Sequence, residues 1–250
     1  MFTLCIPTMD RFHSFLCRYL PLYLQNEYIS EIIISDENGN DYDLILSSFP
    51  NSEKIKCFKN ETHLGPFLNK LNACSKATNE WIVLIDSDNF ASNEYFKIAK
   101  SYIEEYIGEN EKNIILAPSK ALPRFNFSYL NGKVYKKGRF QEINLFEKER
   151  INPSLGKSDV LMNVGNYVLN KYLINNLNLD PERQLIPLSS ACDVVYFNTL
   201  LFEQLDLNMH IVPNLEYTHT EHDGSIYAQT CNDYKQFNEY VYQRYRNLFY

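Results

Sequence analysis

Two aspartates stand directly after an apolar run in the segment "WIVLIDSDNF", which covers residues 81–90. The run from Trp81 to Ile85 is typical of a buried strand. Ionised carboxylates at the end of such a strand are unfavourable unless a positive group meets them. Hard cations such as Mn²⁺ or Mg²⁺ prefer oxygen ligands and usually share them with a diphosphate. Asp86 and Asp88 therefore predict a metal and diphosphate site.

The Asp-x-Asp pattern is weak without its context. It also occurs at Asp41 and Asp43, where no apolar strand precedes it, and about one chance match is expected in a chain of this length. The strand before Asp86 favours that match, because ligands of open α/β sheets bind beyond the carboxyl ends of the strands. The chain has neither G-x-G-x-x-G nor G-x-x-x-x-G-K-[ST], so a metal is expected in place of a phosphate loop.

The segments around this motif alternate between strand and helix patterns. The expected strands are short and rich in β-branched and aromatic residues, and they cover residues 3–6, 28–35, 54–58, 81–85 and 113–118. Helical periodicity is found over residues 65–80 and again after Ser92, which is expected to cap its helix. This alternation predicts an α/β fold with a parallel sheet and helices on its faces.

Charge and composition limit the class of protein. The 250-residue chain has a net charge of -7, which argues against a nucleic-acid partner. Its first residues, "MFTLCIPTMDR", show no basic leader or cleavage site, and no apolar stretch is long enough to span a bilayer. The six cysteines include no C-x-x-C, which favours free thiols. We therefore expect a cytoplasmic protein without a transmembrane segment.

Three segments of the N-terminal half resemble the family 2 glycosyltransferases. "LCIPTMDR" (4–11) is similar to the family's opening strand and turn, and "IIISDENGND" (32–41) resembles its second-strand acidic motif. The segment 60–89, "NETHLGPFLNKLNACSKATNEWIVLIDSDN", is similar to the one that leads into the metal motif. The resemblance covers residues 2–90 well. It implies the GT-A fold, a Rossmann-like nucleotide-diphospho-sugar transferase fold with a mainly parallel central sheet flanked by helices.

The resemblance also implies roles for individual residues. It assigns a nucleotide-sugar donor to Pro7, Thr8, Asp36, Lys70 and Asp86. Pro7 and Thr8 would approach the nucleoside, and Asp36 would meet the base or ribose. Lys70 falls near a position often held by Arg and could meet a phosphate as a point charge. The alternative for Lys70 is a solvent-exposed helix face.

In the second half, the segments 165–174, "GNYVLNKYLI", and 189–205, "SSACDVVYFNTLLFEQL", resemble the family's acceptor region. There a helix opens with an acidic pair, which is Cys192-Asp193 in this chain. The resemblance makes Asp193 the base that removes the acceptor proton in an inverting transfer. The alternative role for Asp193 is a helix cap near the positive end of the helix dipole.

Two histidines lie in the loop-like segment 217–227, "YTHTEHDGSIY". Because many GT-A enzymes complete the metal or diphosphate site with a C-terminal histidine, the resemblance implies that His219 or His222 joins Asp86 and Asp88 as a ligand. The alternative is a surface pair of histidines bonded to backbone groups.

Together these expectations describe a single GT-A domain with a donor half (1–118) and an acceptor half (119–250) that ends in a docking helix. The expected activity is metal-dependent transfer of a sugar, of hexosyltransferase type, from a nucleotide-diphosphate sugar to a glycan, protein or lipid-linked acceptor. The segment 243–247, "QRYRN", lacks the tryptophan of processive synthases, which favours a non-processive enzyme. Two alternatives are a sugar-nucleotide nucleotidyltransferase, which normally has a glycine-rich loop that "PTMDRF" (7–12) lacks, and a non-catalytic binding protein.

Overall fold

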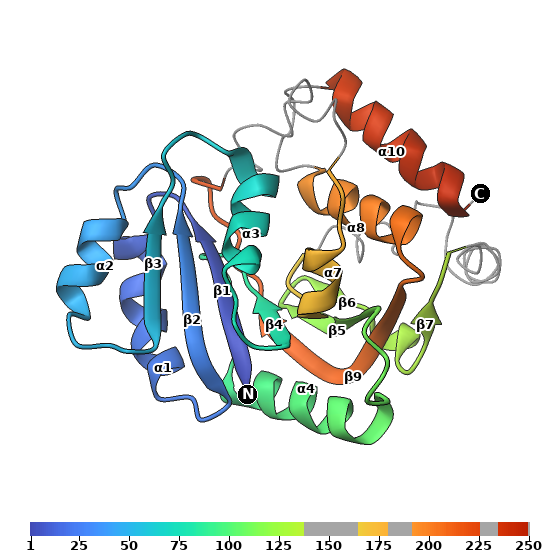
Figure 1. Ribbon diagram of the computed structural model, residues 1–250, viewed down its shortest axis with the longest axis horizontal. Helices are drawn as coiled ribbons and strands as arrows, with labels where there is room; N and C mark the ends of the chain where they lie inside the picture. Colours follow the sequence, from blue (N-terminus) through green and yellow to red (C-terminus); the bar gives the residue numbers. More distant parts are fainter. Residues whose placement is uncertain (138–164, 180–191, 226–234, 250) are drawn as a thin grey trace.

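The computed structural model describes residues 1–137, 165–179, 192–225 and 235–249. These ranges form a nine-stranded sheet of order β3-β2-β1-β4-β8-β5-β9-β7, with β6 paired to β5 (Figure 1). The strands are β1 Phe2–Thr8, β2 Ile29–Asp36, β3 Ile55–Lys59, β4 Trp81–Leu84, β5 Ile114–Leu122, β6 Phe125–Asn126, β7 Val134–Tyr135, β8 Val168–Asn170 and β9 Asn208–Thr218. The helices are η1 Phe12–Leu16, α1 Cys17–Leu24, α2 Tyr42–Ser48, α3 Gly65–Ser75, α4 Asn93–Tyr106, η2 Ser128–Leu130, α7 Lys171–Asn175, α8 Asp193–Gln204 and α10 Lys235–Phe249.

The first four strands form the expected parallel series. β1 lies between β2 and β4, and β2 pairs with β3, all in parallel. In the register of β1 and β2, Thr8 lies opposite Asp36, so the two strands finish together at their carboxyl ends. Helix α3 ends at Ser75, earlier than the sequence pattern predicts, and α4 begins after Ser92 without a side-chain capping bond.

Beyond β4 the sheet is mixed. β8 lies between β4 and β5 and is antiparallel to both, while β5 pairs in parallel with β9. The strand expected at residues 113–118 is therefore present as β5, but it is not the direct neighbour of β4. Local sequence patterns do not encode this insertion, because β8 comes from a segment far along the chain. The proposed boundary between residues 118 and 119 falls inside β5.

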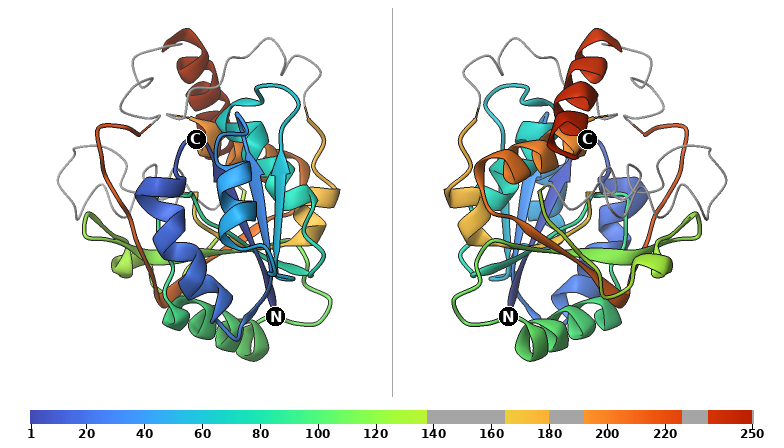
Figure 2. Two further views of the ribbon diagram at one scale, coloured as in Figure 1. Left: turned by 90° about the vertical axis from the view of Figure 1, so that its left-hand side faces the viewer. Right: turned by 90° about the vertical axis from the view of Figure 1, so that its right-hand side faces the viewer.

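Helices cover both faces of the sheet. On β1, the ring of Phe2 lies 6.0 Å from that of Phe96 on α4, and the Cys5 thiol donates to the carbonyl of Ala73 on α3 at 3.5 Å. Alternate strand residues point to opposite faces, so α3 and α4 cover opposite sides. Figure 2 shows the same layering, with α1 and α7 on opposite sides of the sheet.

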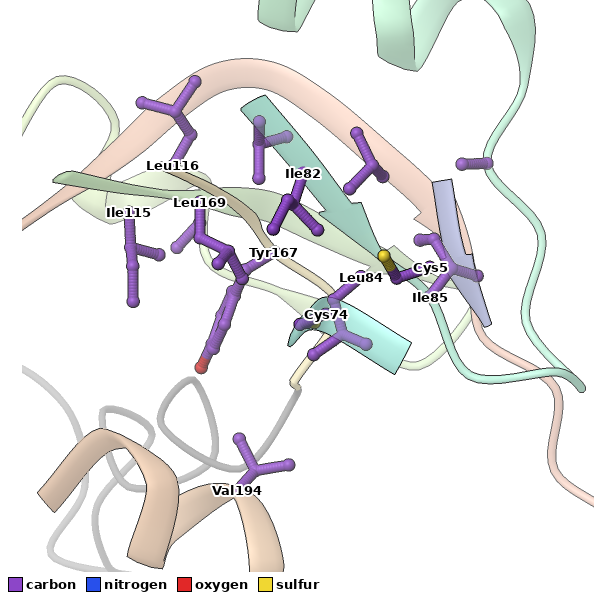
Figure 3. Close-up of a cluster of buried hydrophobic side chains, with 14 of the residues drawn as sticks. Cys5, Cys74, Ile82, Leu84, Ile85, Ile115, Leu116, Tyr167, Leu169 and Val194 are labelled. Atoms are coloured by element: carbon purple, nitrogen blue, oxygen red, sulfur yellow. The ribbon is translucent and has the colours of Figure 1, made fainter. Parts of the chain in front are cut away.

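The buried core continues from the sheet into α3 and α8. Figure 3 shows Cys5, Cys74, Leu84 and Tyr167 in the cluster where α3, β4 and the turn before β8 meet, with Val194 of α8 nearby. These side chains are almost fully buried, so the elements that carry the site residues are packed against one another.

The C-terminal helix α10 lies beside α8 (Figure 1), as expected for a docking helix. Val241 and Tyr245 are buried, and Arg244 donates from Nε to Oε1 of Glu203 at 2.7 Å. None of the helices in the described ranges is both long and apolar enough to cross a membrane.

Candidate active site

Asp86 and Asp88 lie in a tight turn at the carboxyl end of β4. The amide of Asn89 donates to the carbonyl of Asp86 at 2.9 Å, which closes the turn. The amide of Asp86 donates to Oδ1 of Asn166 at 2.8 Å, so the segment before β8 holds the turn in place. The placement predicted from the sequence, at the end of a buried strand, is confirmed.

The chain after β9 crosses this turn and brings His222 to it. Phe90 and Thr218 exchange two backbone hydrogen bonds of 3.0 and 2.8 Å. His222 then places Nε2 3.1 Å from Oδ2 of Asp88. Its ring lies 5.1 Å from the ring of Phe15, and Arg11 donates to the nearby Gly224 carbonyl at 2.6 Å.

The carboxylate of Asp88 is only 20% exposed. Burial raises its pKa above the ordinary range, and the neighbouring charge of Asp86 adds to this rise. The bond from His222 and the charge of Arg11 lower the pKa, but do not cancel the effect of burial. Among the described residues the positive groups near Asp88 do not offset its burial, so a bound cation would favour its ionised form.

Lys70 reaches from α3 to two of the predicted carboxylates. Its Nζ lies 2.8 Å from Oδ2 of Asp193 and 2.9 Å from Oδ1 of Asp86. The Lys70 side chain is 13% exposed, so the alternative of a solvent-exposed helix face is wrong. Burial would lower the pKa of Lys70, but the charges of Asp193 and Asp86 outweigh it and raise the pKa, so the ammonium stays charged.

Asp193 is the first residue of α8 and is 2% exposed. Burial raises its pKa, while the charge and hydrogen bond of Lys70 act in the opposite direction. The helix packs closely on the turn before β8. Gly165 there has a φ of +72°, and a Cβ on it would lie 2.6 Å from Cγ2 of Val194. Only glycine permits this approach, which holds Asp193 near Asp86.

The residues expected at the nucleoside surround the carboxyl ends of β1 and β2. Asp36 is fully buried, and its Oδ2 accepts from the amides of Asp41 and Tyr42 at 2.9 and 2.8 Å. Its Oδ1 is buried without a hydrogen-bond partner in the described part of the chain. Burial raises the pKa of Asp36 against the opposing effect of the Tyr42 amide. Thr8 donates its hydroxyl to Oδ2 of Asp41 at 2.6 Å, and Pro7 is half-buried.

The second Asp-x-Asp match has a structural role. Asp41 accepts hydrogen bonds from the amides of Arg11 and Phe12 as well as from Thr8, and it is 2% exposed. Asp43 is exposed on α2. The match at Asp41 and Asp43, which no apolar strand directly precedes, therefore contributes to the fold through Asp41.

His219 does not lie with His222. Its ring packs 5.3 Å from Phe125 and 6.2 Å from Tyr217, and its amide donates to the Leu122 carbonyl at 2.7 Å. Within the described ranges no contact joins His219 to Asp86 or Asp88, and its buried Nδ1 has no hydrogen-bond partner there. The structure therefore places His222, of the two candidates, at the aspartate turn.

Two residues of the site were not predicted. Asn166 holds the Asp86 amide, and Arg11 both anchors the His222 segment and lowers the pKa of Asp88. Both belong to segments that resemble the family 2 glycosyltransferases, "GNYV" (165–168) and "PTMDR" (7–11). Their contacts span 80 and 213 positions along the chain, so no local pattern could reveal them.

The residues at this turn fit a metal that is shared with a substrate. Asp88 and His222 offer an oxygen and a nitrogen 3.1 Å apart. In the described part of the chain, no three Asp, Glu, His or Cys side chains form a group that could hold a metal ion by themselves. Mg²⁺ usually takes one or two carboxylates and completes its shell with water and substrate phosphates. Two protein ligands and a diphosphate satisfy that requirement.

A search of solved structures found chains of S. aureus TarS with a similar fold. TarS 1-349 in complex with UDP-GlcNAc matches with a TM-score of 0.67 and 15% identity, over 97% of this chain and 66% of that chain. TarS 1-349 in complex with UDP matches with a TM-score of 0.64 and 13% identity, over 98% of this chain and 64% of that chain. The present chain spans less than two thirds of these structures, and the likeness shows a shared fold.

The sequence comparison identifies the family. No curated protein matches the chain. The sequence model described as Glycosyl transferase family 2 matches residues 3–143, which is more than half of the 250 residues and includes Asp36, Lys70, Asp86 and Asp88. The GT-A fold expected from the sequence agrees with this match and with the TarS structures. The chain belongs to glycosyltransferase family 2.

Proposed function

We propose that this protein is a metal-dependent glycosyltransferase that moves a sugar from a nucleotide-diphosphate sugar to an acceptor hydroxyl. The observation that carries the proposal is the contact of Asp88 with His222 at 3.1 Å, beside a lysine that joins Asp86 to Asp193. One site thus combines metal-type ligands, a cation and a candidate base. A UDP-sugar is the first donor to test, because the TarS structures of similar fold contain UDP-GlcNAc and UDP.

The donor end of the site uses residues at the ends of β1, β2 and β4. Asp88 and His222, with Asp86 beside them, would hold Mn²⁺ or Mg²⁺. The bound ion would supply Lewis-acid stabilisation of the diphosphate as it leaves. Asp36 lies at the end of β2, and its Oδ1, which is buried without a hydrogen-bond partner among the described residues, would accept a hydrogen bond from the base or ribose once donor binding exposes it. Pro7 and Thr8 shape the strand end beside it.

The acceptor end of the site is Asp193. In an inverting transfer the acceptor oxygen forms a bond to the anomeric carbon while the bond from that carbon to the diphosphate oxygen breaks. The diphosphate leaves with the bonding electrons, and Asp193 takes the hydroxyl proton. The pKa of Asp193, raised by burial, lies closer to neutrality than that of an exposed aspartate, which suits a general base.

The acceptor and the compartment are also part of the proposal. We expect a glycan, protein or lipid-linked hydroxyl to be the acceptor and transfer to be non-processive. A cytoplasmic location is supported by Cys5, Cys17, Cys57 and Cys74, which form no disulfide in the described ranges.

The test is incubation of the protein with a panel of nucleotide sugars and Mn²⁺, followed by detection of the released nucleotide. Release that stops with EDTA and returns with added Mn²⁺ supports the proposal, and the anomeric configuration of the product, read by NMR, decides between inversion and retention. Formation of a nucleotide sugar from a nucleoside triphosphate and a sugar phosphate would instead identify a nucleotidyltransferase. Donor binding without turnover of any donor would identify a binding protein.

A further inference from the structure

We propose that Lys70 is a positioning residue that fixes the carboxylate of Asp193 relative to Asp86, and so couples the donor site to the base. This inference rests on the proposed function. It differs from the sequence-based expectation, in which Lys70 meets a donor phosphate.

The geometry around Lys70 supports this role. A single nitrogen, Nζ, lies within 3 Å of one oxygen of each carboxylate, at 2.8 Å from Asp193 and 2.9 Å from Asp86. The lysine side chain is 13% exposed, which restricts the conformations that it can adopt. Helix α3 itself is anchored to β1, since Asn69 donates to the Thr8 carbonyl at 3.3 Å. The ammonium is therefore presented from a rigid element.

The two carboxylates are held from the other side by the turn before β8. Asn166 accepts from the amide of Asp86 at 2.8 Å, and Gly165 packs against Val194, the residue after Asp193. Asp86, Lys70 and Asp193 thus belong to a closed set of contacts between α3, β4 and α8.

Asp193 depends on Lys70 more than Asp86 does. Its side chain is 3% exposed, compared with 28% for Asp86, so water cannot replace the lysine. A buried carboxylate that loses its charge partner becomes strongly unfavourable in its ionised form. The contact is made to Oδ2 of Asp193, and we assign the acceptor proton to Oδ1. Lys70 would thereby hold the base both ionised and oriented.

The experiment compares Lys70→Met, which removes the charge, with Lys70→Arg, which keeps it. Lys97→Met is the matched control, because Lys97 also lies on a helix and pairs with a carboxylate but is 56% exposed. We expect Lys70→Met to lower kcat for transfer by about 10²-fold, as small misplacements of a reacting group do. Donor affinity, measured by calorimetry, should change by less than about threefold. Lys70→Arg should recover most of the lost kcat, and Lys97→Met should match the wild type.

A double-mutant cycle with Asp193→Asn completes the test and remains informative if Lys70→Met alone folds poorly. With the base removed, Lys70→Met should lower the remaining kcat by less than about threefold, because residues that act as a unit are not additive. A drop in donor affinity in both backgrounds would overturn the inference in favour of a phosphate ligand. A lower melting temperature with unchanged kcat would overturn it in favour of a structural ion pair. A wild-type protein that turns over no donor would overturn the proposed function itself.

Discussion

Carboxylates at the two ends of the parallel strands differ in how many hydrogen-bond donors surround them. At the amino end, Glu31 of β2 is 4% exposed and accepts four hydrogen bonds. They come from Lys56 Nζ at 2.6 Å, Thr3 Oγ1 at 2.7 Å, the Thr78 amide at 2.8 Å and the Thr78 hydroxyl at 2.9 Å. Burial raises the pKa of Glu31, but these donors outweigh it and leave the pKa lowered. Hydrogen bonds within the protein therefore compensate the burial of the Glu31 carboxylate.

At the carboxyl end, Asp88 is half-buried and Asp193 is buried, but in the described part of the chain each has one side-chain hydrogen-bond partner, His222 and Lys70 respectively. Their pKa values stay raised because burial is not fully offset. This difference between Glu31 and the pair Asp88 and Asp193 indicates where we expect a ligand to bind. A buried carboxylate with a complete set of donors stabilises the fold, whereas we expect a cation or a proton to bind at one that has fewer donors in the described ranges.

The largest effect expected is at Asp88. Asp88→Asn should lower donor turnover by about 10³-fold, because a metal contributes several kcal/mol of transition-state stabilisation. The melting temperature should stay within about 2 °C, since the change removes a charge that burial disfavours. Asp43→Asn, in the other Asp-x-Asp match, is the control and should retain full activity. Turnover that survives both EDTA and Asp88→Asn would remove the metal from the mechanism.

The next largest effect concerns the base. Asp193→Asn keeps the size of the side chain but cannot accept a proton, so kcat for transfer should fall by about 10²-fold or more. Donor affinity should hardly change, because the base does not touch the nucleotide. If Asp193 only stabilises the helix start, the asparagine enzyme will transfer sugar at nearly the normal rate, and Asp193→Ala will lower stability by about 1 kcal/mol.

The amino end should respond in the opposite way. Glu31→Gln weakens the bonds to Lys56, Thr3 and Thr78, so the free energy of unfolding should drop by about 2 kcal/mol, in line with hydrogen bonds to charged groups. The kcat should be unchanged. Urea unfolding and steady-state kinetics on the same preparation measure both. Lys56→Met should cost less stability, because the Lys56 side chain is 48% exposed. If Glu31→Gln lost activity but not stability, the proposed difference between the two ends of the strands would be wrong.

A smaller effect is expected at Asp36, which lies at the carboxyl end but already has two backbone donors. Asp36→Ala should raise the donor KM by about tenfold and change kcat less, as loss of uniform binding does. Part of the effect could come from α2, so Asp36→Asn is the companion variant, and circular dichroism checks the fold. A change confined to kcat would contradict a role in donor binding.

The smallest effect is the pH dependence of the Glu31 contribution. Because the folded pKa of Glu31 is lowered, its stabilisation is present above its unfolded pKa of about 4.3 and is lost as pH falls through the folded value. The stability difference between wild type and Glu31→Gln should therefore shrink between pH 7 and about pH 3. Asp193 has a raised folded pKa, so protonating it should favour the folded state as pH falls. Urea unfolding of wild type and Glu31→Gln at both pH values measures their stability difference. A difference of the same size at both pH values would contradict the prediction.

The sequence by itself determined the local features of this protein. The apolar, β-branched segments before Thr8, Asp36 and Asp86 predicted strands with polar residues at their carboxyl ends. The position of Asp86 and Asp88 directly after a strand and the helix that starts at Asp193 were also predicted. All of these depend on side-chain alternation, helical periodicity and propensity within a few neighbouring residues, which a single sequence displays directly.

Only the tertiary structure decided which of these residues meet. Lys70 and Asp193 are 123 positions apart, and Asp88 and His222 are 134 apart. Their contacts depend on the insertion of β8 between β4 and β5 and on the return of β9 past the turn at Phe90. Strand order and the packing of α3 against α8 are set by the free energy of the whole core. For that reason the sequence left both histidines and two roles for Lys70 open, whereas the packed chain places His222 beside Asp88 and Lys70 between Asp86 and Asp193.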